Sequence, residues 1–156
     1  AVCLTAAAPV RADSWSEGRF PIPVFEGYTS HFGMRRAADG TLRPHNGLDI
    51  AAPFGSPVLC WWHGRVIETI VDDSCGIGVV IASGKYHHIY CHLRRQRLRR
   101  DQWVSAGQVI GQVGLTGRTT GAHLHWGIRH SGRWLDPAEI LRAMIRGRRA
   151  IVPVGP

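Results

Sequence analysis

The six residues from Gly121 to Trp126 (GAHLHW) constrain the fold most, because their polar and apolar side chains alternate. Such alternation is typical of a half-buried β-strand. Residues two apart in a strand point to the same face, about 6–7 Å from each other. His123 and His125 should therefore face outward together, with Leu124 turned toward the core. Two imidazoles on one face can both bind a metal ion, or one can bind it while the other acts beside it.

The density of turn-forming residues predicts short strands. The 156 residues include 19 glycines and 9 prolines, which favour many tight turns over long helices. A chain of this length forms one domain with a substantial core. We expect an extended lead-in at 13–24, a loop at 35–44 and strands at the following ranges: 28–33, 57–71 with a bend at His63-Gly64, 78–82, 85–93, and 103–114 around an Ala106-Gly107 turn.

One helix is predicted near the C-terminus. Asp136 is a suitable N-cap, and Pro137 suits the first helical position. Ile140, Leu141, Met144 and Ile145 should form its buried face. The sequence thus predicts an all-β domain at 25–145 that ends in a short helix, between a leader at 1–24 and a basic tail at 146–156.

The first residues have the composition of a secretory signal. Residues 1–10 are apolar or small, and Val10-x-Ala12 has the spacing of a signal-peptidase site, so we expect a cut after Ala12. That cut would remove Cys3 and leave Cys60, Cys75 and Cys91. One disulfide among these three can form in an oxidising compartment, but their spacing does not assign the pair.

The net charge of +8 indicates anionic surroundings such as nucleic acid, acidic lipid or an anionic cell envelope. Residues 94–100 (RRQRLRR) hold five arginines without interleaved aromatic residues that could stack on bases. We therefore predict no specific nucleic-acid binding. No apolar run is long enough to span a membrane.

Two further segments carry metal-ligand side chains. His45 and Asp49 flank an Asn46-Gly47 turn, which should bring them together although nearby prolines disfavour a helix. His92 lies near the end of the 85–93 strand, where alternation places Tyr86, His88, Tyr90 and His92 on one face. Catalytic zinc typically has three protein ligands and an open fourth position. Four histidines and one aspartate fit three ligands with two histidines left over, but the pattern does not say which histidines bind.

These segments, in this order, resemble the lysostaphin-like (LytM-type) zinc endopeptidases, which cut peptide cross-links in bacterial peptidoglycan. The resemblance covers roughly residues 28–138. It rests on Thr29-Ser30-x-Phe32-Gly33, His45-x-Gly47-x-Asp49-Ile50, Ala52-Pro53-x-Gly55-x-Pro57-Val58, Tyr90-x-His92-Leu93, Gly107-Gln108-Val109-Ile110-Gly111 and Gly114-x-Thr116-Gly117-x-x-x-Gly121-x-His123-Leu124-His125.

The resemblance implies His45, Asp49 and His125 as zinc ligands, with His92 and His123 as the catalytic pair. It also implies mostly antiparallel sheets with the Zn²⁺ at the floor of a groove. Relatives often carry Thr where this chain has His88. An imidazole there would share the predicted face of His92.

The implied function is hydrolysis of peptide stems or cross-bridges of peptidoglycan by a secreted or periplasmic monomer. Water bound to zinc would attack the amide while the two histidines handle protons and the oxyanion, since no His-Glu-x-x-His base is present. Which histidine is the base stays open, as does the bond that is cut. The basic charge would favour loose association with an anionic envelope surface. The alternative is a non-catalytic wall-binding or hydrolase-activating module, whose structural zinc would need four ligands.

Overall fold

The computed structural model describes residues 17–37 and 39–151, with side chains as far as residue 147. The expected signal remnant and Cys3 lie outside these residues. The described elements are β1 (Gly27–Ser30), β2 (Gly33–Arg36), β3 (Leu42–His45), β4 (Leu48–Ala51), β5 (Pro57–Leu59), β6 (Gly64–Asp72), β7 (Gly76–Ser83), β8 (Tyr86–Arg95), β9 (Trp103–Val104), β10 (Val109–Val113), β11 (His123–His130), β12 (Arg133–Leu135) and α1 (Pro137–Ile151).

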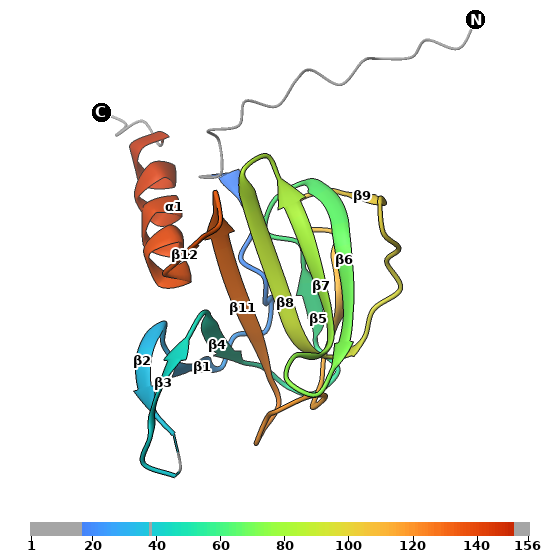
Figure 1. The fold of residues 1–156 in the computed structure, drawn as a ribbon. Helices are drawn as coiled ribbons and strands as arrows, with labels where there is room; N and C mark the ends of the chain where they lie inside the picture. Colours follow the sequence, from blue (N-terminus) through green and yellow to red (C-terminus); the bar gives the residue numbers. More distant parts are fainter. Residues whose placement is uncertain (1–16, 38, 152–156) are drawn as a thin grey trace, which may run out of the picture.

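Ten of the strands form one sheet with the central order β1-β4-β11-β8-β7-β6-β9. β10 bridges β5 and β8, and β12 pairs with β11. The pairings are antiparallel, and the long strands β11, β8, β7 and β6 lie side by side in Figure 1. The predicted all-β, mostly antiparallel fold class with one C-terminal helix is confirmed.

The β2–β3 hairpin stands apart from the large sheet and projects from it (Figure 1). It replaces most of the loop that we predicted at 35–44. The prediction failed because neither face of this hairpin packs on the core: Met34 and Leu42 are exposed, so no apolar alternation marks the strands. Asp39 closes the turn by accepting a hydrogen bond from the Thr41 amide at 3.0 Å.

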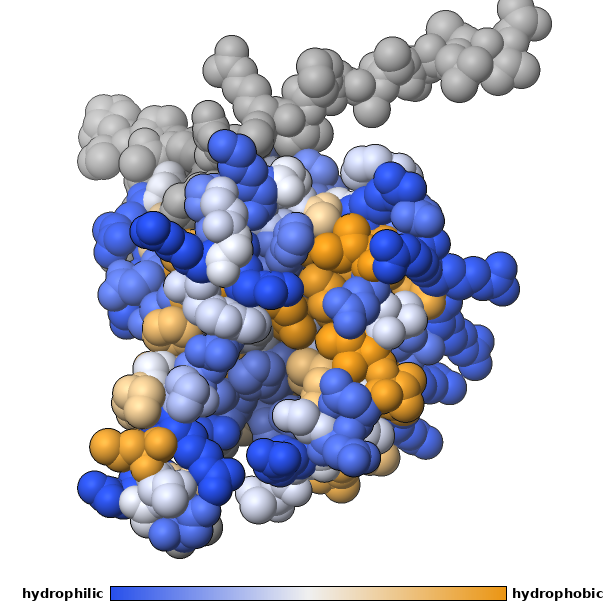
Figure 2. Space-filling view, viewed as in Figure 1, coloured by the Kyte–Doolittle hydropathy of each residue, from blue (hydrophilic) through white to orange (hydrophobic). Residues whose placement is uncertain are grey.

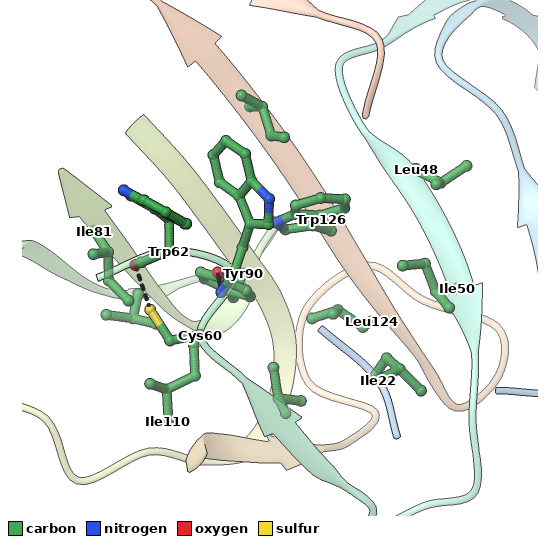
Figure 3. Packing of buried hydrophobic residues seen from close by; sticks show 14 of the residues in the cluster. Ile22, Leu48, Ile50, Cys60, Trp62, Ile81, Tyr90, Ile110, Leu124 and Trp126 are labelled. Carbon is green, nitrogen blue, oxygen red and sulfur yellow. Dashed lines mark hydrogen bonds between the residues drawn. The ribbon is translucent and has the colours of Figure 1, made fainter. Parts of the chain in front are cut away.

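The core lies against the inner face of the large sheet (Figure 3). Trp61 contacts Trp126 edge-to-face, with 5.9 Å between ring centroids, and the Trp61 amide donates to the Tyr90 hydroxyl at 2.8 Å. Ile22 lies in the same cluster near Ile50 and is 1% exposed. The described part of the predicted lead-in, residues 17–24, contains no strand and bends at residues 21, 23 and 24, and burial of Ile22 means that the folded unit begins before residue 25.

The helix α1 begins where the sequence predicts, because Asp136 Oδ1 accepts the Ala138 amide at 2.9 Å. Its buried face includes Ile140, Leu141 and Met144. Ile145, which we placed on that face, is 53% exposed, and the helix continues to Ile151 through the start of the predicted tail. Among the described residues no helix is both long and apolar enough to cross a bilayer.

Candidate metal and catalytic site

Regular strand pairing positions two of the predicted metal ligands. Asp49 on β4 and His125 on β11 are direct partners in the antiparallel register, so their side chains leave the sheet next to each other. Leu124 is fully buried between the two outward-facing histidines, as the alternation predicts. The β2–β3 hairpin supplies His45, the last residue of β3, which meets Asp49 after the short connection at 46–47.

The three candidate ligand atoms form a compact triangle. His45 Nε2 lies 3.0 Å from Asp49 Oδ1 and 3.1 Å from His125 Nδ1, and the latter two atoms are 2.8 Å apart. Ligand atoms about 2.0–2.1 Å from a tetrahedral zinc ion lie roughly 3.3–3.4 Å from one another. These atoms therefore need only small shifts to hold one ion, and the donor set suits zinc.

Neighbouring groups orient the ligands. His45 Nδ1 lies 2.7 Å from the His31 carbonyl, which can only accept a hydrogen bond. In the neutral ring Nδ1 therefore carries the proton, and the lone pair of Nε2 is available to a metal ion. Arg35 Nη1 donates to Asp49 Oδ2 at 3.2 Å and leaves Oδ1 facing the histidines. Our sequence analysis missed Arg35, because an arginine in an exposed hairpin resembles an ordinary solvated residue.

The electrostatics keep Asp49 ionised. Burial by itself would raise the pKa of Asp49. In the metal-free site, hydrogen bonds from the protonated forms of His125 and His45, and the charges of those forms, outweigh burial and hold that pKa well below its usual range. A carboxylate that stays negative is the form that a metal ion requires.

Gly47 serves close packing as well as the turn that we predicted. A Cβ at this position would lie 2.5 Å from His125 Cε1 and 2.9 Å from the Trp126 carbonyl oxygen. Any larger residue would therefore force the His125 ring or the Trp126 backbone to move.

His92 and His123 lie beside this triangle. Their ring centroids are 4.8 Å apart, and His92 lies 5.9 Å from His125. Each Nδ1 faces a backbone carbonyl: that of His92 faces Thr116 at 2.9 Å, and that of His123 faces Gly121 at 2.8 Å. Because carbonyls only accept, both Nδ1 atoms carry protons, and in the neutral rings both Nε2 atoms keep lone pairs. His123 Nε2 lies 3.7 Å from Asp49 Oδ1, so its lone pair faces the metal triangle.

His92 reaches the groove through a β-bulge that we did not predict. Strand β8 changes register against β7 between Tyr90 and Leu93, and His92 has a φ of 62°. This left-handed conformation costs a non-glycine residue about 1–2 kcal/mol. The bulge turns His92 away from the core, whereas Tyr90 and Leu93 on either side are both fully buried. Burial lowers the pKa of His92, the Thr116 carbonyl opposes that shift, and the charges of His123 and His125 add to it.

The prediction that His88 and His92 share one face of the strand is wrong, because the bulge separates them. His88 lies in the core and is fully buried, where its Nδ1 accepts from the Tyr90 hydroxyl at 2.8 Å and its Nε2 donates to Ser83 Oγ at 2.9 Å. Ser83 Oγ in turn donates to the His63 carbonyl at 2.6 Å. Every polar atom of the imidazole is satisfied, so His88 is a structural residue.

The site lies in a groove of about 610 Å³ between the β2–β3 hairpin and the body of the domain. Figure 2 shows the hydrophilic recess beside the projecting hairpin. Arg35, Arg36 and Arg43 line one wall and Arg118 lines the other, while Asp49 is the one acidic residue among the described residues of the lining. Arg35 contacts Asp49, Arg36 donates to the Gly40 carbonyl, and Arg43 pairs with Asp39. Arg118 is exposed and adds positive charge to its wall.

Residues 43–137 match the model of Peptidase family M23. This span is more than half of the chain and includes all five predicted site residues. The chain therefore belongs to Peptidase family M23, which confirms the resemblance inferred from the motifs.

Relatives and solved structures agree with this assignment. The peptidoglycan DD-endopeptidase ShyA of Vibrio cholerae is 39% identical over 130 residues, which cover 81% of this chain and 30% of ShyA. A zinc-containing peptidase from Vibrio cholerae has a TM-score of 0.72 at 34% identity, covering 81% of this chain and 39% of that one. Lysostaphin from Staphylococcus simulans has a TM-score of 0.67 at 25% identity, covering 83% of this chain and 54% of lysostaphin. The chain thus spans less than a third of ShyA.

Proposed function

We propose that this chain is a zinc-dependent endopeptidase domain that hydrolyses peptide cross-links of bacterial peptidoglycan. One observation carries the proposal: three ligand atoms within 3.1 Å of one another lie beside two imidazoles whose Nε2 atoms keep their lone pairs. The family and the names of its relatives supply the substrate class.

His45, Asp49 and His125 would hold the ion, through Nε2, Oδ1 and Nδ1 respectively. When bound, a Zn²⁺ ion supplies Lewis acidity, which makes water more acidic and polarises a scissile carbonyl. The chain's own residues prepare this site by keeping Asp49 ionised and by fixing the tautomer of His45.

His92 and His123 would divide the proton chemistry. With its Nδ1 proton held by a carbonyl, a neutral imidazole can accept a proton only at Nε2, so it can act as the base toward water. The same ring can donate from Nε2 only when it is protonated, which is the form that stabilises an oxyanion. The pair therefore works with one ring neutral and the other protonated, and the base then returns its proton to the leaving amine.

The alternative, a non-catalytic module with a structural zinc, has less support. A structural site is closed by four protein ligands, whereas the metal-ligand group within the described residues has three members. The neighbouring imidazoles face this open side, which suits chemistry better than structural binding.

The groove suggests the character of the substrate and where the enzyme acts. Of the arginines in the described lining, Arg35 and Arg43 form ion pairs with Asp49 and Asp39. The other two, Arg36 and Arg118, favour a peptide that carries free carboxylates near the cut bond. Such peptides lie in the cell wall, so we propose a secreted or periplasmic location. The net charge of +8 would add salt-sensitive attraction to the anionic envelope.

The decisive experiment is digestion of purified peptidoglycan with the zinc-loaded protein, with the released fragments identified by mass spectrometry. We expect cross-linked fragments to be converted into monomeric stem peptides, and a chelator should stop the conversion until zinc is restored. Intact cross-links after prolonged digestion, with zinc bound, would favour the non-catalytic alternative.

A further inference from the structure

A disulfide between Cys75 and Cys91 lies in the wall of the groove, directly before His92 in the sequence. Its two cysteines join the β6–β7 turn to strand β8 at the point where the bulge begins. Cys60 is free and buried, and it donates to the Trp62 carbonyl at 2.9 Å. Burial raises the pKa of Cys60 to about 12, so this thiol does not compete for the pairing.

The same turn also binds His92 through the main chain. The His92 amide donates to the Cys75 carbonyl at 2.8 Å. Asp72 Oδ1 accepts the amides of Ser74 and Cys75 at 2.8 and 2.7 Å, which fixes the conformation of the turn. One ordered turn is thus attached to His92 by a hydrogen bond and to the preceding residue, Cys91, by the disulfide.

Thr116 holds His92 from the other side. Its carbonyl accepts the His92 Nδ1 proton, while its hydroxyl donates to the Leu93 carbonyl at 2.7 Å and accepts the Ile77 amide at 2.9 Å. The turn and the Thr116 loop pack backbone against backbone, since a Cβ on Gly117 would lie 2.4 Å from the Gly76 nitrogen. Movement of the turn would therefore move both supports of His92.

The proposed metal ligands meet these supports where His125 pairs with Cys91 in the β11–β8 register, and their other described supports lie elsewhere. Asp49 and His125 are held by the β4–β11 pairing, and His45 is held by the His31 carbonyl and the β2–β3 hairpin. Loss of the disulfide should consequently displace His92 and leave the metal triangle in place.

We propose that Cys75, Cys91 and Thr116 are positioning residues for His92, so that the proton-handling half of the site is complete only when the disulfide has formed. This inference rests on the proposed peptidase function. A reduced enzyme would bind its metal yet cleave slowly. Activity would therefore depend on an oxidising compartment.

The test compares the Cys75→Ser/Cys91→Ser double variant with the unmodified enzyme. Both cysteines are replaced because one remaining thiol beside the groove could itself bind zinc. Bound zinc and the thermal midpoint are measured for each protein. The kcat and KM are measured on a cross-linked stem peptide, at a temperature well below the thermal midpoints of all variants. We expect full zinc content, a KM within about twofold, and a kcat lowered by on the order of 10- to 100-fold, as for a misplaced catalytic group.

A phosphine reductant provides the matching reversible experiment. It gives two electrons to the disulfide, the S–S bond breaks, two protons from water complete the thiols, and the phosphine takes the water oxygen. Reduction should lower the kcat of the unmodified enzyme to that of the double variant, and should leave the double variant unchanged.

Thr116→Val and Thr116→Ser test the second support without touching the disulfide. The valine variant loses both hydroxyl hydrogen bonds and should lose kcat, whereas the serine variant keeps them and should restore it. Ile140→Ala, in the buried face of α1 and outside the groove lining, is the control for lowered stability alone and should keep its kcat.

Full kcat in a folded double variant or in Thr116→Val would overturn the inference and leave the peptidase function standing. Zinc loss in step with activity would also overturn it, because the disulfide would then support the metal half. Failure of the unmodified, oxidised enzyme to cleave would overturn the proposed function, and the positioning role with it.

Discussion

The two halves of the site are built in different ways. Asp49 and His125 leave two regular strands at paired positions, and His45 is held to a backbone carbonyl at the end of a hairpin. His92 instead leaves a bulge in a left-handed conformation and depends on a turn, a disulfide and a loop from distant parts of the chain. The metal half is thus set by strand register, and the His92 half by packing around an irregularity.

This difference predicts that the halves can be disabled separately. A strand-held ligand set should survive local changes in the wall, whereas a catalytic group on a bulge should be sensitive to them. Substitutions in each half should therefore give distinct combinations of zinc content, rate and stability.

The largest effect is expected for His125→Ala. The variant should lose both zinc and cleavage, because two ligands are too few to hold the ion and Asp49 loses its shortest contact to a partner histidine. Zinc content by elemental analysis and release of wall fragments measure the two effects. His130→Ala, near the end of the same strand, is the control and should keep both.

His92→Ala and His123→Ala should retain zinc and lose at least about 10²-fold in kcat, on the scale of removing one general base or oxyanion donor. Turnover of a cross-linked peptide, measured beside zinc content, tests this. The control is His87→Ala. His87 lies on β8, as His92 does, but outside the groove lining. Loss of the metal from His92→Ala would contradict the independence of the two halves.

His88 should affect stability instead of catalysis. Burial first, then the charges of His87 and His63, lower the pKa of His88 to about 3. The unfolded chain therefore binds more protons at this residue once the pH falls below about 6.5. The stability that neutral His88 provides is complete above that pH. It decreases by about 1.4 kcal/mol per unit as the pH falls toward the folded pKa.

Thermal midpoints between pH 4 and 7 test this expectation for the unmodified protein and for His88→Thr. The variant should be less stable at neutral pH but should lose less of its stability on acidification. An unchanged pH dependence would show that His88 does not titrate on unfolding as proposed. Its kcat at pH 7 should stay close to that of the unmodified enzyme.

The smallest effect is expected for Arg118→Gln in the groove wall. It should raise KM several-fold for a stem peptide with free carboxylates and have little effect on the matching carboxamide peptide, because an exposed cation contributes on the order of 1 kcal/mol at most. Arg97→Gln makes the same charge change outside the groove lining and is the control. Equal effects on both peptides would remove the carboxylate preference from the proposal.

Local sequence patterns were sufficient for much of this molecule. Alternation around Leu124 predicted the strand of His123 and His125, and Asp136-Pro137 predicted the start of α1. The order of the motifs predicted the family and the fold class. These features follow from period-two geometry and capping chemistry, which act over a few residues.

Long-range contacts decided the features of the fold and the site that local patterns did not predict. Alternation placed His92 with His88, but a bulge held by Cys75 and Thr116 turned it into the groove. Three other features likewise depend on contacts between residues far apart in the chain. They are the cysteine pairing, the contact of Arg35 with Asp49 and the burial of Ile22 in the core. The sequence alone determined which side chains are available for chemistry. Only the tertiary structure decided which of them meet, because an irregular backbone conformation persists only where distant segments hold it.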